Sequence, residues 1–254
     1  MSDVLVQRDG AFTTITMNRP RRRNALSRAF LLSLTEAFRE VADTDARGIV
    51  LAAEGPVFSA GHDFADLAGA SHAEVRSLLQ TCTELMRTIQ SVPQVVVARV
   101  HALATAAGCQ LVASCDLAVA AESAGFAAPG GKGGWFCHTP MVPIARGVGR
   151  KRAVEMALTG EVVDARTAAA WGLINYAVPD AELGEATLAL LTRATQGSPS
   201  SKALGKQALY AQLDRPEADA YTYAIEVMAA ASQTPEAQEG MRAFLDKRRP
   251  DWPA

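Results

Sequence analysis

The histidines and cysteines are the side chains of this chain best suited to acid–base, nucleophilic or metal-binding chemistry. Histidine titrates near neutral pH, and a cysteine thiolate is both a nucleophile and a metal ligand. The candidates are His62, His72, His101 and His138, with Cys82, Cys109, Cys115 and Cys137. Because no His-Glu-x-x-His or Cys-x-x-Cys spacing occurs among them, we expect no metal site and free, buried thiols.

Two other stretches approach catalytic patterns without matching them. The glycine-rich run at residues 130–134 looks like a phosphate cradle, but the Walker spacing is not met and no Ser or Thr follows Lys132. Ser123 lies in a near match to a nucleophile elbow, in which Ala121 stands where the first glycine belongs. We therefore expect neither a Walker-type nucleotide site nor a serine nucleophile.

Composition narrows the class of protein. Apolar residues make up 49% of the 254 residues and charged residues 20%, which is ordinary for a globular protein and argues against disorder. The net charge of −2 disfavours a general nucleic-acid binder. Residues 100–115 are too short to cross a bilayer, and residues 1–10 contain no apolar signal core. We therefore expect a cytoplasmic protein without nucleic-acid or membrane partners.

Hydrophobic periodicity predicts an α/β core followed by helices. Apolar runs predict strands at residues 4–6, 13–17, 48–53, 95–100 and 117–121. Helical spacing predicts helices at residues 24–41, 74–89 and 106–114, and then at 150–158, 165–172, 186–194, 201–213 and 218–231. Alternating strands and helices favour βαβ units with a parallel sheet, so we expect an α/β core of roughly 190 residues and a helical C-terminal lobe.

Four segments, which together span almost the whole chain, carry a resemblance to a known family. They are Asn-Arg-Pro at 18–20 with Asn-Ala-Leu at 24–26; Phe-Ser-Ala-Gly-His-Asp at 58–63; Ala-Gly-Cys-Gln-Leu at 107–111 with Ser-Cys-Asp at 114–116; and Trp-Gly-Leu-Ile-Asn at 171–175 with Glu-Gly at 239–240 and residues 244–252. In order and spacing they resemble the crotonase superfamily, the enoyl-CoA hydratase/isomerase family.

The resemblance implies a crotonase (ClpP-like) α/β fold, which is a spiral of ββα turns with a C-terminal helical trimerisation lobe. It divides the chain into an acyl-CoA-binding core at residues 1–195 and a helical lobe at residues 196–254. It also implies a homotrimer or a dimer of trimers. The expected ligand is an acyl-CoA or enoyl-CoA thioester, with no other cofactor and no metal.

The family's shared chemistry is stabilisation of a thioester enolate by two backbone N–H groups. Preorganised donors of this kind are worth roughly 3–4 kcal/mol each in comparable enzymes. The resemblance assigns them to His62 and Ala107. Family members usually carry three glycines at 106–108, of which only Gly108 remains here. We expect both N–H donors to be retained, in a site that the alanine side chains make narrower. We also expect further contacts to the substrate from Ala60, Gly61, Gly108, Trp135 and Phe136.

The two glutamates that hydratases of this family use are missing. Their positions are Gln110 and Gly130 in this chain. Glutamine cannot accept a proton at neutral pH, glycine has no side chain, and acid–base catalysis typically supplies ~10²–10⁴-fold per group. The resemblance therefore implies weak or absent hydration.

Other side chains could supply proton transfer. Some relatives carry a working carboxylate about eight residues beyond the second glutamate, and His138 occupies that place here. The alternative for His138 is a capping or partly exposed residue. The His62 side chain could act in addition to its N–H. We expect Asp116 to be structural, at a strand entrance, and Cys109 and Cys137 to be packing thiols beside the pocket.

Basic clusters complete the candidate site. The resemblance places Arg21, Arg22 and Arg23 near the CoA phosphates, where guanidinium groups suit phosphate. It places Phe244 and Lys247 near the same ligand, in a C-terminal part that in the family can reach a neighbouring subunit. Solvated surface charge is the alternative for these clusters.

Three functional hypotheses follow. The first is an enzyme that polarises an acyl-CoA thioester, with His138 or water handling protons, in isomerisation, decarboxylation or thioester hydrolysis. The second is a non-catalytic acyl-CoA carrier or regulator. The third is a structural subunit paired with an active homologue.

Overall fold

The computed structural model describes residues 2–252 of the chain, and within them a six-stranded sheet forms the centre of the fold. Its order is β1-β2-β3-β4-β6-β9; β1 is antiparallel to β2, and every other neighbouring pair is parallel. The apolar strands β3 and β4 are almost wholly buried, as parallel strands covered on both faces must be. The bounds are β1 Val4–Asp9, β2 Phe12–Met17, β3 Gly48–Ala53, β4 Val95–Val100, β6 Leu117–Ala121 and β9 Tyr176–Val178.

A smaller sheet of three short strands, in the order β5-β7-β8, joins the loops around the core. Its strands are β5 Ala104–Thr105, β7 Gly125–Ala127 and β8 Val163–Asp164. Neither this sheet nor β9 was predicted, because a strand of two or three residues is too short to show a hydrophobic period. The predicted strands at 48–53, 95–100 and 117–121 are confirmed.

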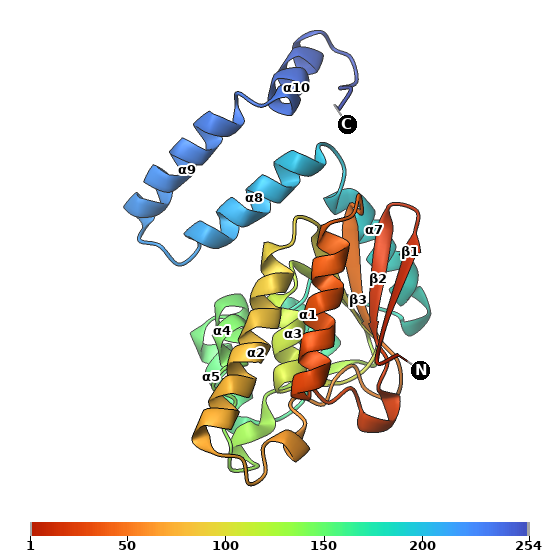
Figure 1. The fold of residues 1–254 in the computed structure, drawn as a ribbon, viewed down its shortest axis with the longest axis vertical. Helices are drawn as coiled ribbons and strands as arrows, with labels where there is room; N and C mark the ends of the chain where they lie inside the picture. The colour runs from red at the N-terminus through yellow and green to blue at the C-terminus, as the bar shows by residue number, and fades with distance from the viewer. Residues whose placement is uncertain (1, 253–254) are drawn as a thin grey trace.

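Helices cover both faces of the central sheet (Figure 1). α1 (Arg28–Ala42) packs on β1 and β2, and α7 (Leu183–Ala194) packs on β4 and β6. α2 (His72–Ser91) lies against α1 and against α3 (Ala107–Ser114). The remaining core helices are α4 (Met141–Val148), α5 (Arg150–Thr159) and α6 (Ala165–Trp171). The sequence predicted all of these except α4.

The first helix begins later than the prediction of residue 24. The Ser27 side chain caps it by accepting the Phe30 N–H at 3.3 Å. Asn24 is buried in the preceding loop with a φ of 49°, where its amide donates to the carbonyls of Glu54 and Val57. Asparagine tolerates this left-handed conformation and favours loops by bonding to nearby backbone groups, so the helical apolar pattern does not extend to it.

A helical lobe follows the core, made of α8 (Pro199–Gln212), α9 (Glu217–Ala231) and α10 (Pro235–Leu245). It extends away from the sheet at one end of the molecule (Figure 1). The predicted boundary at residue 195 falls between α7 and α8, and α10 was not predicted. No apolar residue of α8 or α9, all of which the structure describes, is buried. The lobe leaves large apolar side chains exposed, among them Leu209, Leu213, Tyr221, Ile225 and Met228.

A buried polar cluster fastens this lobe to the core. Lys206 Nζ of α8 lies 2.8 Å from Asp116 Oδ2, and the Tyr210 hydroxyl donates to Asp116 Oδ1 at 2.8 Å. The Val96 N–H also donates to this carboxylate, at 2.7 Å. Burial raises the pKa of Asp116 and lowers the pKa of Lys206, and their attraction opposes both shifts. Asp116 thus accepts a hydrogen bond from the start of β4 and anchors the helical lobe to the core.

Candidate active site

Two backbone N–H groups, those of His62 and Ala107, meet beside a small cavity. Both residues line that cavity. A Cβ added at Gly61 would lie 3.2 Å from the Ala107 nitrogen, so the two backbone segments are in close contact. Neither N–H has a hydrogen-bond acceptor within residues 2–252. The pair is therefore free to donate to a ligand, and the N-terminal end of α3 adds a favourable dipole for negative charge.

The segment that carries the first donor is clamped between two others. The Leu26 N–H donates to the Gly61 carbonyl at 2.7 Å, and the Thr105 N–H donates to the Ser59 carbonyl at 3.0 Å. Gly61 has a φ of +85°, a conformation that glycine adopts without strain. These contacts fix the direction of the His62 N–H before any ligand arrives.

The turn into α3 carries strain at Ala106. Its φ of 51° and ψ of −120° lie in a region that L-residues rarely occupy. Gly108, in contrast, has no room for a side chain, because a Cβ there would lie 2.4 Å from the Ser59 carbonyl oxygen. Ala106 therefore adopts a backbone conformation typical of glycine although it carries a Cβ.

Replacing Ala106 with glycine is expected to raise the free energy of unfolding by about 1 kcal/mol, because glycine relieves the positive φ. Urea unfolding measures this change. The matched control is Ala113→Gly inside α3, which is expected to lower stability by about 0.5–1 kcal/mol. Two losses of similar size would contradict the strain at Ala106.

The cavity has a volume of about 100 Å³. It brings together seven of the fifteen residues that the sequence predicted for the site. These are Ala60, His62, Ala107, Gly130, Trp135, Phe136 and His138. Phe64, Leu79 and Pro140 also line it and were not predicted, because no motif marks an apolar wall built from three separate segments.

His62 lines this cavity and is half-buried, with both ring nitrogens shielded from solvent. Neither ring nitrogen has a hydrogen-bond partner within residues 2–252. The ring centroid lies 6.0 Å from that of Trp135, which in turn packs edge-on against Phe64. Burial lowers the pKa of His62, and the nearby Leu26 backbone opposes this only in part. The imidazole is therefore neutral at neutral pH.

The free energy of unfolding is expected to fall as the pH drops below 6.5, the ordinary pKa of histidine. The folded pKa of His62 lies lower, so the unfolded chain binds the proton first and stability is lost as the pH falls through the folded pKa. Urea unfolding at pH 7.5 and 5.5 should show a larger loss in the native protein than in His62→Phe. His72→Phe, at the exposed start of α2, is the control and should behave like the native protein.

His138 lies on the rim of the cavity with its side chain exposed and its ring centroid 5.0 Å from that of Phe136. Cys137 beside it is buried, and burial raises its pKa. Burial also raises the pKa of Cys109 to about 12. Both thiols are therefore protonated at neutral pH and poor nucleophiles, in line with the packing role expected from the sequence. All four cysteines are free and buried.

The two positions of the family's glutamates differ in their surroundings. Gln110 is buried on α3, one turn beyond Ala107, and does not line the cavity. Its Oε1 has no hydrogen-bond partner within the described part of the chain. Gly130 does line the cavity, but a Cβ there would lie 2.2 Å from the Trp135 carbonyl oxygen. Neither position presents an acid or a base.

The three arginines at residues 21–23 differ in their contacts. Arg22 donates to both oxygens of Asp63, at 3.0 and 2.8 Å, and holds the pKa of that carboxyl below its ordinary value. Arg22 is thus held in an ion pair with the residue that follows His62. Arg21 and Arg23 are exposed, and within residues 2–252 their side chains form no hydrogen bond or ion pair.

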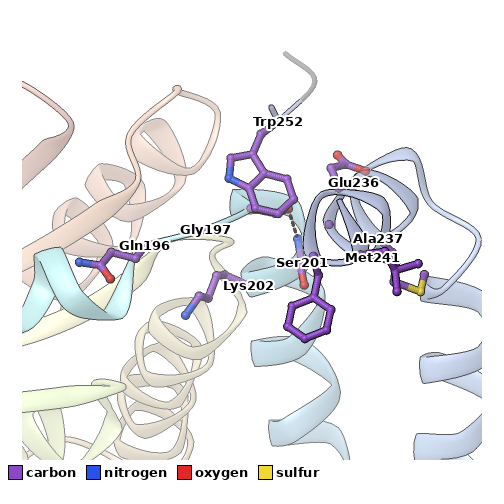
Figure 2. A pocket seen from close by; sticks show the side chains of 12 residues that line it. Gln196, Gly197, Ser201, Lys202, Glu236, Ala237, Met241 and Trp252 are labelled. Atoms are coloured by element: carbon purple, nitrogen blue, oxygen red, sulfur yellow. Dashed lines mark hydrogen bonds between the residues drawn. The ribbon is translucent and has the colours of Figure 1, made fainter. Parts of the chain in front are cut away.

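Phe244 and Lys247 do not reach this cavity within one chain. Phe244 lies on α10, at the other end of the molecule from α4 and α5 (Figure 1). It lines a separate cavity of about 630 Å³ between α8, α10 and the C-terminal tail, together with Lys202 and Trp252 (Figure 2). Lys247 follows α10 with a φ of 54°. Their expected place near the ligand, in a C-terminal part that can reach a neighbouring subunit, stays a prediction.

Within the described residues, no cluster of His, Cys, Asp and Glu could hold a metal ion. No helix among them combines the length and apolar character of a membrane span.

The parallel sheet, the helical lobe and the paired N–H groups define a crotonase-type α/β protein. The model of the family described as Enoyl-CoA hydratase/isomerase matches residues 7–254. The chain belongs to this family, which confirms the resemblance seen in the four sequence segments.

Relatives and solved structures agree with this assignment. The rat enoyl-CoA hydratase domain-containing protein 3, mitochondrial, is 45% identical over 251 residues, which cover 97% of this chain and 82% of the rat protein. The crystal structure of the human protein of that name superposes with a TM-score of 0.94 at 41% identity, covering 99% of this chain and 100% of the human one. An enoyl-CoA hydratase from Mycobacterium smegmatis gives a TM-score of 0.95 at 44% identity, with 99% of both chains covered.

Proposed function

We propose that this protein binds an acyl-CoA thioester in the cavity and stabilises its enolate through the N–H groups of His62 and Ala107. The observation that carries the proposal is that these two N–H groups lack partners in the described chain and meet beside the cavity. Fixed donors aimed at a developing negative charge need no reorganisation during the reaction. The guanidinium groups of Arg21 and Arg23, which have no partner among residues 2–252, are suited to the CoA phosphates.

Ordinary hydration is expected to be weak. It needs one group to activate water and another to protonate the α-carbon, whereas Gln110 and Gly130 supply neither. Isomerisation, decarboxylation and thioester hydrolysis require fewer acid–base groups. His138, exposed at the rim, or water would handle protons in these reactions.

A non-catalytic acyl-CoA carrier or regulator is the second candidate. The observation in its favour is that the donor pair is intact while both glutamate positions have lost their carboxylates. Such a protein would bind thioesters without moving a proton.

Homotrimers, or dimers of trimers, form part of the proposal. The exposed apolar side chains of the lobe support it, because exposed apolar surface of this extent marks interaction sites. A neighbouring chain could then receive Phe244 and Lys247. Analytical ultracentrifugation measures the assembly state. The cytoplasmic location and the lack of a further cofactor stay predictions.

Deuterium incorporation at the α-carbon of acyl-CoA and enoyl-CoA thioesters in heavy water, followed by mass spectrometry, tests the enolate directly. Exchange that disappears in His138→Ala but persists in His72→Ala would identify an enzyme and its base. Exchange that persists in His138→Ala would leave the enolate proposal standing and remove His138 from it. Thioester binding without exchange would favour the carrier, and an absence of binding would contradict both candidates.

A further inference from the structure

We propose that Glu239 is a positioning residue for the binding of an acyl-CoA by a neighbouring copy of the chain. It holds the turn after α10, and so fixes the Lys247 ammonium group for contact with the phosphates of that ligand. The inference rests on the proposed function, since it assumes that acyl-CoA binds and that the copies assemble. It adds a residue of α10 that acts on the ligand through Lys247.

The Glu239 carboxylate fastens the tail of the chain to α10. Arg248 donates to both of its oxygens, at 2.6 and 2.9 Å, and the Asp251 N–H donates to Oε1 at 2.7 Å. These hydrogen bonds hold the pKa of Glu239 at about 2, so the carboxylate is charged at neutral pH. A guanidinium that pairs with both oxygens of a carboxylate is fixed in orientation as well as in distance.

Trp252 adds an apolar contact to the same part of α10. A Cβ added at Gly240 would lie 3.4 Å from the Cη2 atom of the Trp252 ring, so the indole packs against the helix at this glycine. Glu239 and Gly240 are neighbours on α10, and their partners all lie in residues 248–252. Two adjacent residues of the helix thus hold the segment that follows Lys247.

Lys247 stands at the position of this turn where glycine is usual. The Arg248 N–H donates to the Ala243 carbonyl at 3.0 Å and the Lys247 N–H to the Phe244 carbonyl at 3.2 Å, which is the pattern of a Schellman motif. Lys247 has the left-handed conformation that the motif requires, with a φ of 54°. Glycine would adopt it without strain. A lysine at this position therefore indicates a use for its side chain.

The Lys247 side chain is available to a ligand. It is exposed, and within residues 2–252 it forms no hydrogen bond or ion pair, whereas Arg248 beside it is committed to Glu239. α10 lies at the other end of the molecule from α4 and α5, so a ligand in the cavity that also meets Lys247 belongs to another copy (Figure 1). An ammonium group suits phosphate as a point charge, and CoA carries its phosphates at the adenosine end.

A double-mutant cycle tests whether Glu239 acts through Lys247. Isothermal titration calorimetry with butyryl-CoA is expected to show that Glu239→Gln weakens binding about fivefold or more, because a neutral amide cannot hold the guanidinium. Lys247→Ala is expected to weaken binding at least as much, and the double variant to lose no more than Lys247→Ala alone. Glu122→Gln, which breaks the exposed ion pair with Arg166, is the control and should bind as the native protein does.

Two further measurements distinguish positioning from a purely structural role. Lys247→Gly is expected to raise the thermal midpoint, because glycine relieves the left-handed strain, and yet to weaken butyryl-CoA binding as much as Lys247→Ala. Butyryl-pantetheine, the same thioester without the adenosine phosphates, is expected to bind Glu239→Gln within about twofold of its affinity for the native protein. Circular dichroism and analytical ultracentrifugation verify the fold and the assembly of each variant.

The outcomes separate this inference from the function on which it rests. A native protein that does not bind butyryl-CoA would overturn both. Native-like affinity of Glu239→Gln or Lys247→Ala, or a native protein that binds butyryl-CoA as a monomer, would overturn the positioning role and leave acyl-CoA binding intact.

Three further results would overturn the positioning role, because Glu239 would then act independently of Lys247. They are losses that add in the double variant, an equal loss with butyryl-pantetheine, and a Glu239→Gln variant that no longer assembles.

Discussion

Replacing Lys206 with methionine is expected to lower the free energy of unfolding by about 3–5 kcal/mol, because it leaves the Asp116 carboxylate buried without its cation. The side chains of Lys206 and Asp116 are only 8% and 13% exposed, so water cannot take the place of the ammonium group. Lys206 also donates to two backbone carbonyls, those of Ile89 and Gln94, which would lose a partner. Urea unfolding followed by circular dichroism measures the change.

A surface ion pair supplies the control for this prediction. Arg166 and Glu122 approach to 2.8 Å, but their side chains are 76% and 35% exposed. Arg166→Met is therefore expected to cost less than about 1 kcal/mol. If Lys206→Met also lowers the free energy of unfolding by less than about 1 kcal/mol, the buried pair does not hold the lobe to the core.

A glutamate at position 130 is expected to destabilise the protein and not to create hydratase activity. The Cβ of any side chain there would lie 2.2 Å from the Trp135 carbonyl oxygen, 2.8 Å from Cys137 Sγ and 3.0 Å from the Cys137 nitrogen. Two of these atoms belong to the backbone, so the loop that forms the cavity wall must move. Such overpacking typically costs ~1–3 kcal/mol.

Gly130→Ala isolates the steric part of this prediction from the effect of charge. It is expected to lose about 1–3 kcal/mol. Gly133→Ala, in the same loop, is the control: its Cβ would meet only the Gly130 carbonyl oxygen, at 3.7 Å, and its stability should change by less than about 0.5 kcal/mol. Hydration of an enoyl-CoA by Gly130→Glu, with native-like stability, would contradict the geometry at this position.

The parts of the fold that could be predicted are those in which one physical signal spans several residues. The valine-rich strand at 95–100 and the amphipathic helix α2 follow from hydrophobic patterning alone. The small sheet could not be predicted in this way, because its strands are two or three residues long. The start of α1 was misplaced because the amide of Asn24 bonds to Glu54 and Val57, some thirty residues away in the chain.

The same distinction holds for the candidate site. The motif at 58–63 and the start of α3 placed the two donors next to each other, since both lie on the family pattern. Trp135, Phe136 and His138 also line the expected cavity. The place of Leu79 depends on how α2 packs, and that of Phe64 on the turn at residues 64–66, neither of which a motif encodes. The positioning of Gln110 outside the lining, and of Phe244 on a distant helix, likewise follows from tertiary packing.

Helices α8 and α9 bury no apolar side chain, and this affects how the folded chain opens locally. Segments that bury little are the first to unfold locally, and their amide protons exchange with solvent through that opening. The amides of α8 and α9 should therefore exchange ahead of those in β3 and β4. Because covering the lobe by another copy would close this route, the exchange rate of these helices at increasing protein concentration becomes a direct reporter of assembly.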